Sequence, residues 1–266
     1  MLSSVVTQVR DLLPKRLQVP AKYWFRWLRR GLEKEMVLLD AIIRKNDRVL
    51  DVGGNRGVYA YRFWRLGAAV EVFEPNSDCH EILAEWAEGK PRVNLHAVAL
   101  SNREGAAILH IPVDKAGVKH DASASIETMD CTQTHDQSVV LRTLDSYKFK
   151  GVSLIKIDVE GHEYGVIEGA EEALSLSMPA LLVEVEERHN SRPIGVVFEK
   201  IIGLGYAGFF LEDGGLTAIS HFDVTRHQSM NSLGKSNGLY INNFLFLHKN
   251  KLANGEYKSL VKWGLR

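Results

Sequence analysis

A glycine-rich loop and an acidic residue after it are the first residues in this chain whose spacing could do chemistry. The loop, DVGGNRG over residues 51–57, follows a short apolar run, and Glu74 ends the next apolar run 23 residues after Asp51. Glycines at a strand end let a ligand approach the main chain and let the chain turn sharply into a helix. A carboxylate after the second strand can accept hydrogen bonds from both hydroxyls of a ribose. The pair predicts a site for a nucleoside-containing cofactor.

The residues around the loop distinguish between cofactors. A dinucleotide site has the pattern Gly-x-Gly-x-x-Gly, but Val52 stands where its first glycine belongs. The acidic Asp51 before the loop is unfavourable beside a pyrophosphate and favourable beside an ammonium or a sulfonium, because opposite charges attract. S-adenosylmethionine carries both cations. We therefore predict this cofactor, with a nicotinamide-dependent oxidoreductase as the alternative.

A second group of titratable residues is predicted to be catalytic: Asp158, Glu160 and His162, which follow the apolar run at 152–157. Methyl transfer is an in-line displacement, so an enzyme positions the acceptor and, for a hydroxyl, removes its proton. His162 is the candidate general base because histidine titrates near neutral pH. Asp158 would orient that histidine or bind the acceptor. The alternative is structural, with a carboxylate that caps the next helix and a histidine exposed in its first turn.

The same acids could hold a divalent metal that lowers the pKa of a substrate hydroxyl. Glu184 and Glu186, after a later strand, would join Asp158, Glu160 and His162, with Asp158 and Glu184 as first candidates. Nothing in the spacing demands a metal. We therefore predict no metal ligand and keep a divalent metal as an alternative cofactor.

The elements that must position these residues alternate between strands and helices. Strands are expected at 48–52, 69–74, 93–100, 152–158, 180–186, 206–211 and 240–247, and helices at 56–66, 78–88, 163–174 and 194–203. This alternation predicts an α/β fold with a doubly wound, mostly parallel, seven-stranded sheet that ends in an antiparallel pair. We expect a helical extension over 1–45, the cofactor-binding domain over 46–250 and a tail over 251–266.

The N-terminal extension is basic. Eight Lys or Arg and two acidic residues give the first 34 positions a net charge of +6, which leaves −6 for the rest. From Ala21 onward apolar residues recur with a helical period, at Trp24, Trp27, Leu28, Leu32, Met36, Leu38, Leu39, Ile42 and Ile43. This predicts one amphipathic helix whose apolar side packs against the body. Contact of residues 21–34 with an anionic membrane surface and a role as a dimer surface are the alternatives.

A polar stretch over 114–137 interrupts the alternation between two expected strands, 106–113 and 138–144. A loop this long in a compact domain is usually functional or disordered. Its short polar side chains, among them Ser123 and Ser125, could bind a polyhydroxylated acceptor, and Arg188, past a later strand, could pair with an anionic one. We predict these three as substrate-binding residues.

Composition limits the class of protein. The 266 residues are 45% hydrophobic and 25% charged with a net charge of +0, as in a globular protein that does not mainly bind nucleic acid. The two cysteines, Cys79 and Cys131, have no metal-ligand spacing, and we expect a reducing compartment. We find no signal-peptide pattern and no run of about 20 apolar residues. A cytoplasmic location is expected.

The chain resembles class I S-adenosylmethionine-dependent methyltransferases and, more narrowly, the FkbM family. The resemblance covers about residues 46–248 and rests on VLDVGGNRG, VEVFEPN, LRTLDS, LIKIDVEGHEYGVIEGA, PALLVEVE and NNFLFL, of which IKIDVEGHE is the most specific. It implies O-methylation of a sugar hydroxyl or a related small molecule such as a natural product. A module that binds the cofactor without catalysis is a further alternative.

The resemblance also implies the cofactor contacts. Around the methionine tail and ribose it places the loop residues and the acid after the second strand, Asp51, Gly53, Gly54, Asn55, Gly57 and Glu74, and near adenine it places Ala97 and Val98. Gly54 stands where the family pattern has alanine.

Overall fold

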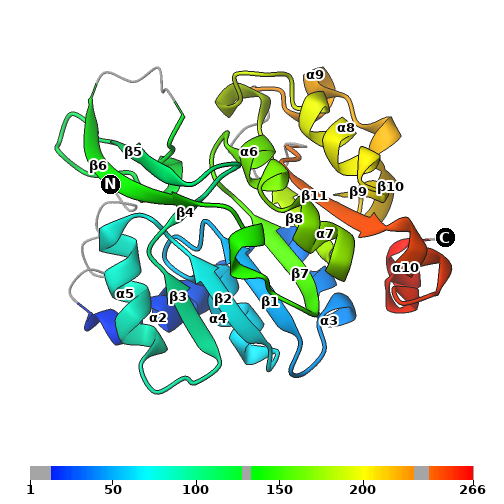
Figure 1. Ribbon diagram of the computed structural model, residues 1–266, viewed down its shortest axis with the longest axis horizontal. Coiled ribbons are helices and arrows are strands. Elements are labelled where there is room, and N and C mark those ends of the chain that lie inside the picture. The colour runs from blue at the N-terminus through cyan, green and yellow to red at the C-terminus, as the bar shows by residue number, and fades with distance from the viewer. Residues whose placement is uncertain (1–12, 128–132, 231–239, 266) are drawn as a thin grey trace.

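The computed structural model describes residues 13–127, 133–230 and 240–265. Its main element is an eight-stranded sheet of order β10-β9-β11-β8-β7-β1-β2-β3 (Figure 1). The strands are β1 Arg48–Val52, β2 Ala69–Phe73, β3 Val93–His96, β7 Val152–Ile157, β8 Ala180–Glu184, β9 Tyr206–Glu212, β10 Gly215–Ala218 and β11 Asn243–His248. The α/β doubly wound fold is confirmed. The expected count of seven strands is wrong, because β10 folds back on β9 and adds an edge strand.

The order of the strands reverses at β1. β1 pairs in parallel with β2 on one side and with β7 on the other, although β7 follows about 100 residues later. The carboxyl ends of β1 and β7 therefore diverge into connections on opposite sides, which is the point where open α/β sheets bind ligands. β11 runs antiparallel to both β8 and β9, as expected for the final pair.

Helices cover both faces of the sheet, and the period-2 alternation of each strand supplies a core to each face. One core lies under α2 Lys15–Leu28, α3 Leu39–Ile42, α4 Val58–Arg65, α5 Ser77–Ala87 and the C-terminal α10 Lys249–Ala253, with the 3₁₀ segments η1 Lys34–Leu38 and η6 Lys258–Trp263. The other lies under α6 Glu163–Glu168, α7 Glu171–Ser177 and α8 Gly195–Gly203, with α9 Val224–His227 nearby. The predicted helix over 163–174 is thus two helices.

The insertion forms a second, three-stranded sheet of order β4-β6-β5. β5 Gly105–Pro112 and β6 Thr134–Arg142 pair antiparallel, and β4 Ala99–Leu100 pairs with β6. The expected single strand over 93–100 is therefore wrong, since its two halves belong to different sheets. The described part of the connection after β5, residues 113–127, contains the 3₁₀ turn η2 Asp121–Ser123, and Arg56 of the glycine loop pairs with Asp121 there. This places it over the carboxyl ends of the strands.

The N-terminal extension differs from the prediction. It is not one helix from Ala21 to Ile43, because α2 ends at Leu28 and the short elements η1 and α3 follow. α2 buries Val19 and Tyr23, whereas the expected packing residues Trp24, Trp27 and Leu28 are exposed. Helix α2 packs through its other side, on α5 and α4.

Cys79 is buried with a free thiol, and Cys131 lies outside the residues described. Over residues 13–127, 133–230 and 240–265, we find no helix with the length and apolar character to cross a membrane.

Candidate active site

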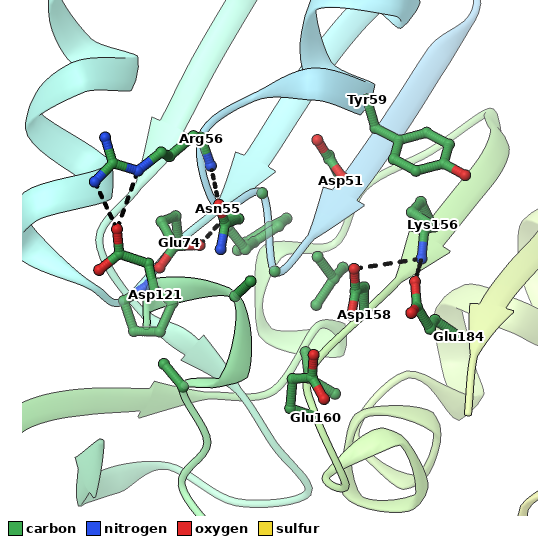
Figure 2. Close-up of a pocket in the computed structure, with 18 of the residues that line it drawn as sticks. Asp51, Asn55, Arg56, Tyr59, Glu74, Asp121, Lys156, Asp158, Glu160 and Glu184 are labelled. Carbon is green, nitrogen blue, oxygen red and sulfur yellow. Dashed lines mark hydrogen bonds and ion pairs between the residues drawn. The ribbon is translucent and has the colours of Figure 1, made fainter. Parts of the chain in front are cut away.

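A cavity opens at the carboxyl ends of β1, β2, β7 and β8, beneath α2 and the insertion. Its wall is made by residues from the glycine loop, both strand ends beside it, the N-terminal extension and the insertion, among them Lys22, Arg26, Glu33, Asp51, Gly53, Gly54, Asn55, Arg56, Tyr59, Glu74, Val98, Asp121, Ser125, Lys156, Asp158, Glu160, His162 and Glu184. Figure 2 shows two groups of polar side chains, one around Glu74 and one around Lys156, with Asp51 between them. We call these the Glu74 end and the Lys156 end.

At the Glu74 end, backbone amides hold a buried carboxylate. Glu74 follows β2 and is 6% exposed. Its Oε2 accepts a hydrogen bond from the amide of Asn55 at 2.6 Å, and its Oε1 accepts one from the amide of Asn76 at 2.7 Å. Burial raises the pKa of Glu74 to about 7, because its effect outweighs that of the two amide hydrogen bonds, which lower the pKa. Each oxygen retains a lone pair, so the carboxylate can still accept hydrogen bonds from a ligand.

Asp51 carries an unsatisfied oxygen. The residue is 2% exposed, and its Oδ2 has no hydrogen-bond partner. Burial raises the pKa of Asp51 to about 7, although the charge of Lys156 opposes that shift. A buried acceptor without a partner is costly. In the wall of a cavity, such an oxygen is a position for a cationic or hydrogen-bond-donating ligand.

The glycines of the loop have a packing role. Gly53 has φ +80°, and a Cβ there would lie 1.8 Å from the carbonyl oxygen of Asp158, so the β1 and β7 loops touch only because this residue is glycine. A Cβ on Gly54 would lie 2.3 Å from Val72, so the alanine of the family pattern does not fit here without a shift. Two of the predicted cofactor residues are not in the cavity wall: Gly57 caps the N-terminus of α4, and Ala97 faces a separate groove. The others line the cavity, namely Asp51, Gly53, Gly54, Asn55, Glu74 and Val98.

At the Lys156 end, a buried lysine lies between two acids. Lys156 is 0% exposed, and its Nζ is 3.7 Å from Asp158 Oδ2 and 3.4 Å from Glu184 Oε2. The alternation of the strands explains the arrangement. Side chains two residues apart on a strand point to the same face of the sheet. Three residues of one core, Val49, Leu154 and Leu182, lie two positions before Asp51, Lys156 and Glu184 respectively. The three side chains therefore point to the face that α2 and α4 cover.

The acids at this end are harder to ionise than in water. Withdrawal from solvent raises the pKa of Asp158 to about 6, with Lys156 opposing the shift. Burial and the neighbouring Asp158 raise the pKa of Glu184 well above its usual range. The two carboxyls share Lys156 and interact with each other, so they titrate as a pair.

Tyr59 and Glu33 complete the Lys156 end, and the sequence analysis missed both. The hydroxyl of Tyr59, in the first turn of α4, donates to Glu33, which lies between α2 and η1. The Nζ of Lys156 lies 5.1 Å from the centre of the Tyr59 ring. Lys156 is likewise not among the residues predicted for the site, although a lysine within the apolar run LIKI is a signal that the sequence carries. Glu33 has no comparable signal.

His162 is held away from Asp158. Its Nδ1 is 2.6 Å from Glu127 of the insertion, and its Nε2 is 3.0 Å from the hydroxyl of Ser101. Since both ring nitrogens have these partners, Asp158 does not orient His162, and the other expectation for Asp158, contact with the acceptor, stays a prediction. The His162 side chain is 14% exposed, so it is not an exposed first-turn histidine. Glu160 lines the cavity with φ +50° and pairs with His189.

The predicted substrate residues lie in different places. Ser125 lines the cavity, but its hydroxyl donates to the carbonyl of Glu160 at 2.7 Å. Ser123 belongs to η2 and is not part of the cavity wall, and Arg188 pairs with Glu186 at 2.5 Å outside it. A salt bridge that was not predicted from the sequence joins the insertion to the glycine loop. The guanidinium of Arg56 lies 2.7 Å from the carboxylate of Asp121 (Figure 2).

The acids that could have bound a metal have other partners. Glu186 accepts from Arg188 and Tyr240, and Asp158 and Glu184 flank Lys156. No group of three or more His, Cys, Asp or Glu within the described part of the chain is arranged to hold a metal ion.

The family is decided by comparison with known proteins. The model of the methyltransferase FkbM domain matches residues 51–209, more than half of the chain. The chain belongs to the FkbM methyltransferase family. The matched region contains the glycine loop, Glu74, the insertion and the ends of β7 and β8, which carry Lys156 and Glu184. No curated protein sequence matches the chain.

Two solved structures illustrate the similarity. One is a methyltransferase FkbM from Methylobacillus flagellatus KT, with a TM-score of 0.51 and 14% identity over 90% of this chain. The chain spans 57% of that protein. The other is an rRNA methylase from Streptococcus thermophilus, with a TM-score of 0.46 and 12% identity over 81% of this chain and 95% of the other. At 14% identity, the similarity to the Methylobacillus flagellatus protein shows a shared fold and nothing about the substrate.

Proposed function

We propose that the protein is an S-adenosylmethionine-dependent methyltransferase that methylates a hydroxyl oxygen of a sugar or related small molecule. The observation that carries the proposal is a single cavity in which Asp51, with an unsatisfied buried oxygen, lies between the Glu74 carboxylate and the Lys156 end. Membership in the FkbM family supports the reaction class.

The residues present fit the proposed cofactor. The free oxygen of Asp51 suits the ammonium of the methionine tail, and the remaining lone pairs of Glu74 suit the two ribose hydroxyls. Val98, in the cavity wall beyond β3, offers an apolar contact for adenine. When bound, S-adenosylmethionine supplies an electrophilic methyl group.

We propose Asp158 as the general base at the Lys156 end. It is 32% exposed in the cavity, so a hydroxyl can reach its free edge, and its raised pKa of about 6 suits proton removal near neutral pH. Lys156 and Glu184 hold the other edge, which fixes the direction of the carboxylate. His162 is a positioning residue that joins the insertion to the segment after β7. Glu160, paired with His189, lines the acceptor side.

The remaining parts of the proposal concern the acceptor and location. Ser125 closes the cavity through its contact with the Glu160 carbonyl, and Ser123 and Arg188 are left as candidates for contacts with a larger acceptor. Neither a metal ion nor a nucleic acid is required. The proposed location is the cytoplasm.

Calorimetry tests the proposal. We expect S-adenosylmethionine and S-adenosylhomocysteine to bind with micromolar Kd and NAD not to bind. Glu74→Ala should weaken binding at least about 100-fold, because it removes a charged acceptor of two hydrogen bonds. Glu85→Ala, an exposed acid on α5, is the matched control. Binding of NAD in preference would favour the oxidoreductase, and cofactor binding without any methyl transfer would favour the non-catalytic module.

A further inference from the structure

Helix α2 presents an apolar stripe to solvent. Leu17, Trp24 and Leu28 are 47%, 42% and 75% exposed and, with Ala21 between them, follow the spacing of one helix face. The opposite side carries Val19, which is fully buried in the core. Helix α2 therefore has two apolar sides. Only the side that carries Val19 packs against the rest of the fold.

The stripe is concentrated. Phe25 and Trp27, 41% and 56% exposed, flank it, so five of the thirteen large hydrophobic side chains exposed in the described residues fall within twelve positions of α2. Apolar side chains scattered singly over a surface need no explanation, but a contiguous patch marks an interaction site. The residues Leu17, Trp24, Phe25, Trp27 and Leu28 are called the α2 patch below.

Positive charge surrounds the α2 patch. Arg16 precedes Leu17, Arg29 and Arg30 follow Leu28, and all three are exposed. Arg29 lies over the Phe25 ring at 5.4 Å, and Arg65 lies over the Trp24 ring at 4.8 Å. The rest of the chain has the opposite net charge. An occupant that is both apolar and negatively charged complements this surface, and tryptophan with arginine is the combination that binds the headgroup level of an anionic bilayer.

The same helix is a wall of the cavity. Lys22 and Arg26, on the side of α2 turned from the patch, line the cavity, with Lys22 3.4 Å from Asn55 and Arg26 3.5 Å from Glu33. A helix is about 10–12 Å across, so a bilayer against the α2 patch lies within one helix diameter of the cavity. The two cations on the inner side suit an acceptor that contains a phosphate.

We infer that α2 lies on an anionic bilayer through the α2 patch and that the methyl acceptor is a hydroxylated headgroup of an anionic phospholipid. The first part of this inference, binding of α2 to the bilayer, is called the binding half, and the second part, the identity of the acceptor, is called the acceptor half. The binding half does not depend on the methyltransferase activity. The acceptor half rests on the proposed function and names its substrate class.

Vesicle sedimentation tests the binding half with the full chain and no cofactor. We expect binding to phosphatidylglycerol–phosphatidylcholine vesicles, at least tenfold weaker binding to phosphatidylcholine alone, and release at 0.5 M NaCl. Trp24→Ala with Leu28→Ala should weaken binding at least about tenfold, and Arg29→Gln with Arg30→Gln should do the same. Leu176→Ala with Val261→Ala removes equally exposed side chains elsewhere and should leave binding unchanged. Circular dichroism verifies that each variant is folded.

Two results would overturn the binding half. One is equal binding to neutral and anionic vesicles, or none to either. The other is a dimer, detected by analytical ultracentrifugation, that is lost in Trp24→Ala with Leu28→Ala, because a second copy would then cover the α2 patch.

The acceptor half is measured as S-adenosylhomocysteine formation. Vesicles that contain phosphatidylinositol or phosphatidylglycerol should react at least tenfold faster than equal concentrations of inositol phosphate or glycerol phosphate. Faster reaction of the soluble compounds, or of uncharged sugars, would overturn this half while vesicle binding stands. Failure of the proposed function is distinguishable, since S-adenosylmethionine would then not bind or none of the lipids, phosphates and sugars would react, and sedimentation would be unaffected.

Discussion

The two ends of the cavity hold their charges by different means. At the Glu74 end, backbone amides from two successive loops satisfy one carboxylate. At the Lys156 end, side chains satisfy side chains, and they come from the extension, α4, β7 and β8. Amides that belong to the strand–loop–helix unit are fixed wherever that unit folds. A network of side chains depends on packing between distant segments, so it can differ between proteins that share a cofactor.

Asp158→Asn is the change that should separate the ends most. We expect kcat to fall about 10²–10⁴-fold, because a general base contributes that much, while the Kd for S-adenosylmethionine changes by less than about threefold. Turnover is followed as S-adenosylhomocysteine formation with the best acceptor in a panel of sugars and lipids. Glu172→Gln, an exposed acid on α7, is the control. Loss of cofactor binding with unchanged kcat would contradict the assignment.

Asp51→Asn probes the boundary between the ends. The amide cannot neutralise a cation, so we expect the Kd for S-adenosylmethionine to rise about 10–100-fold. Stability should change in the opposite direction. The raised pKa means that Asp51 lowers the free energy of unfolding increasingly as pH rises from its usual pKa near 4, and by its full amount above about 7. The variant should therefore unfold at a Tm higher by about 2 °C or more at pH 8, and the difference should shrink as pH falls from 7 and vanish below about pH 4. A lower Tm at pH 8 would contradict this account.

Cofactor binding should depend on pH. Asp51 and Glu74 have pKa values raised to about 7, and the cofactor favours their ionised forms. Below pH 7 the Kd should fall by up to about 100-fold per pH unit as pH rises, because each of the two acids contributes about tenfold, and above pH 8 it should level off. Calorimetry in buffers of different ionisation enthalpy should detect proton release at pH 6. A Kd that does not change between pH 5.5 and 8 would contradict the burial of these acids.

Tyr59→Phe should have the smallest effect. It removes one hydroxyl that donates to Glu33 at the Lys156 end. We expect the acceptor KM to rise about fivefold or less, with kcat and cofactor Kd nearly unchanged, since one hydrogen bond contributes about 1 kcal/mol. Initial rates at varied acceptor concentration separate these constants. A larger fall in kcat than in Asp158→Asn would assign proton removal to Tyr59 instead.

The sequence alone determined the alternation of strands and helices, the family and the Glu74 end. These depend on short runs, such as DVGGNRG and the acid that ends the next strand, because β1, its loop and β2 are adjacent in both sequence and space. The ends of two predicted strands also placed Asp158 and Glu184 at one edge of the sheet, because the carboxyl ends of neighbouring parallel strands meet at the same edge.

Only the tertiary structure decided the partners of those residues. It separated His162 from Asp158, placed Lys156 between two acids and turned Trp24 and Trp27 outward. A helical period identifies apolar faces but not which face meets the body when both are apolar, as in α2. The choice is made by contacts with α4 and α5, which lie more than 30 residues away in the chain. Long-range packing of that kind leaves no periodic signal in a single sequence.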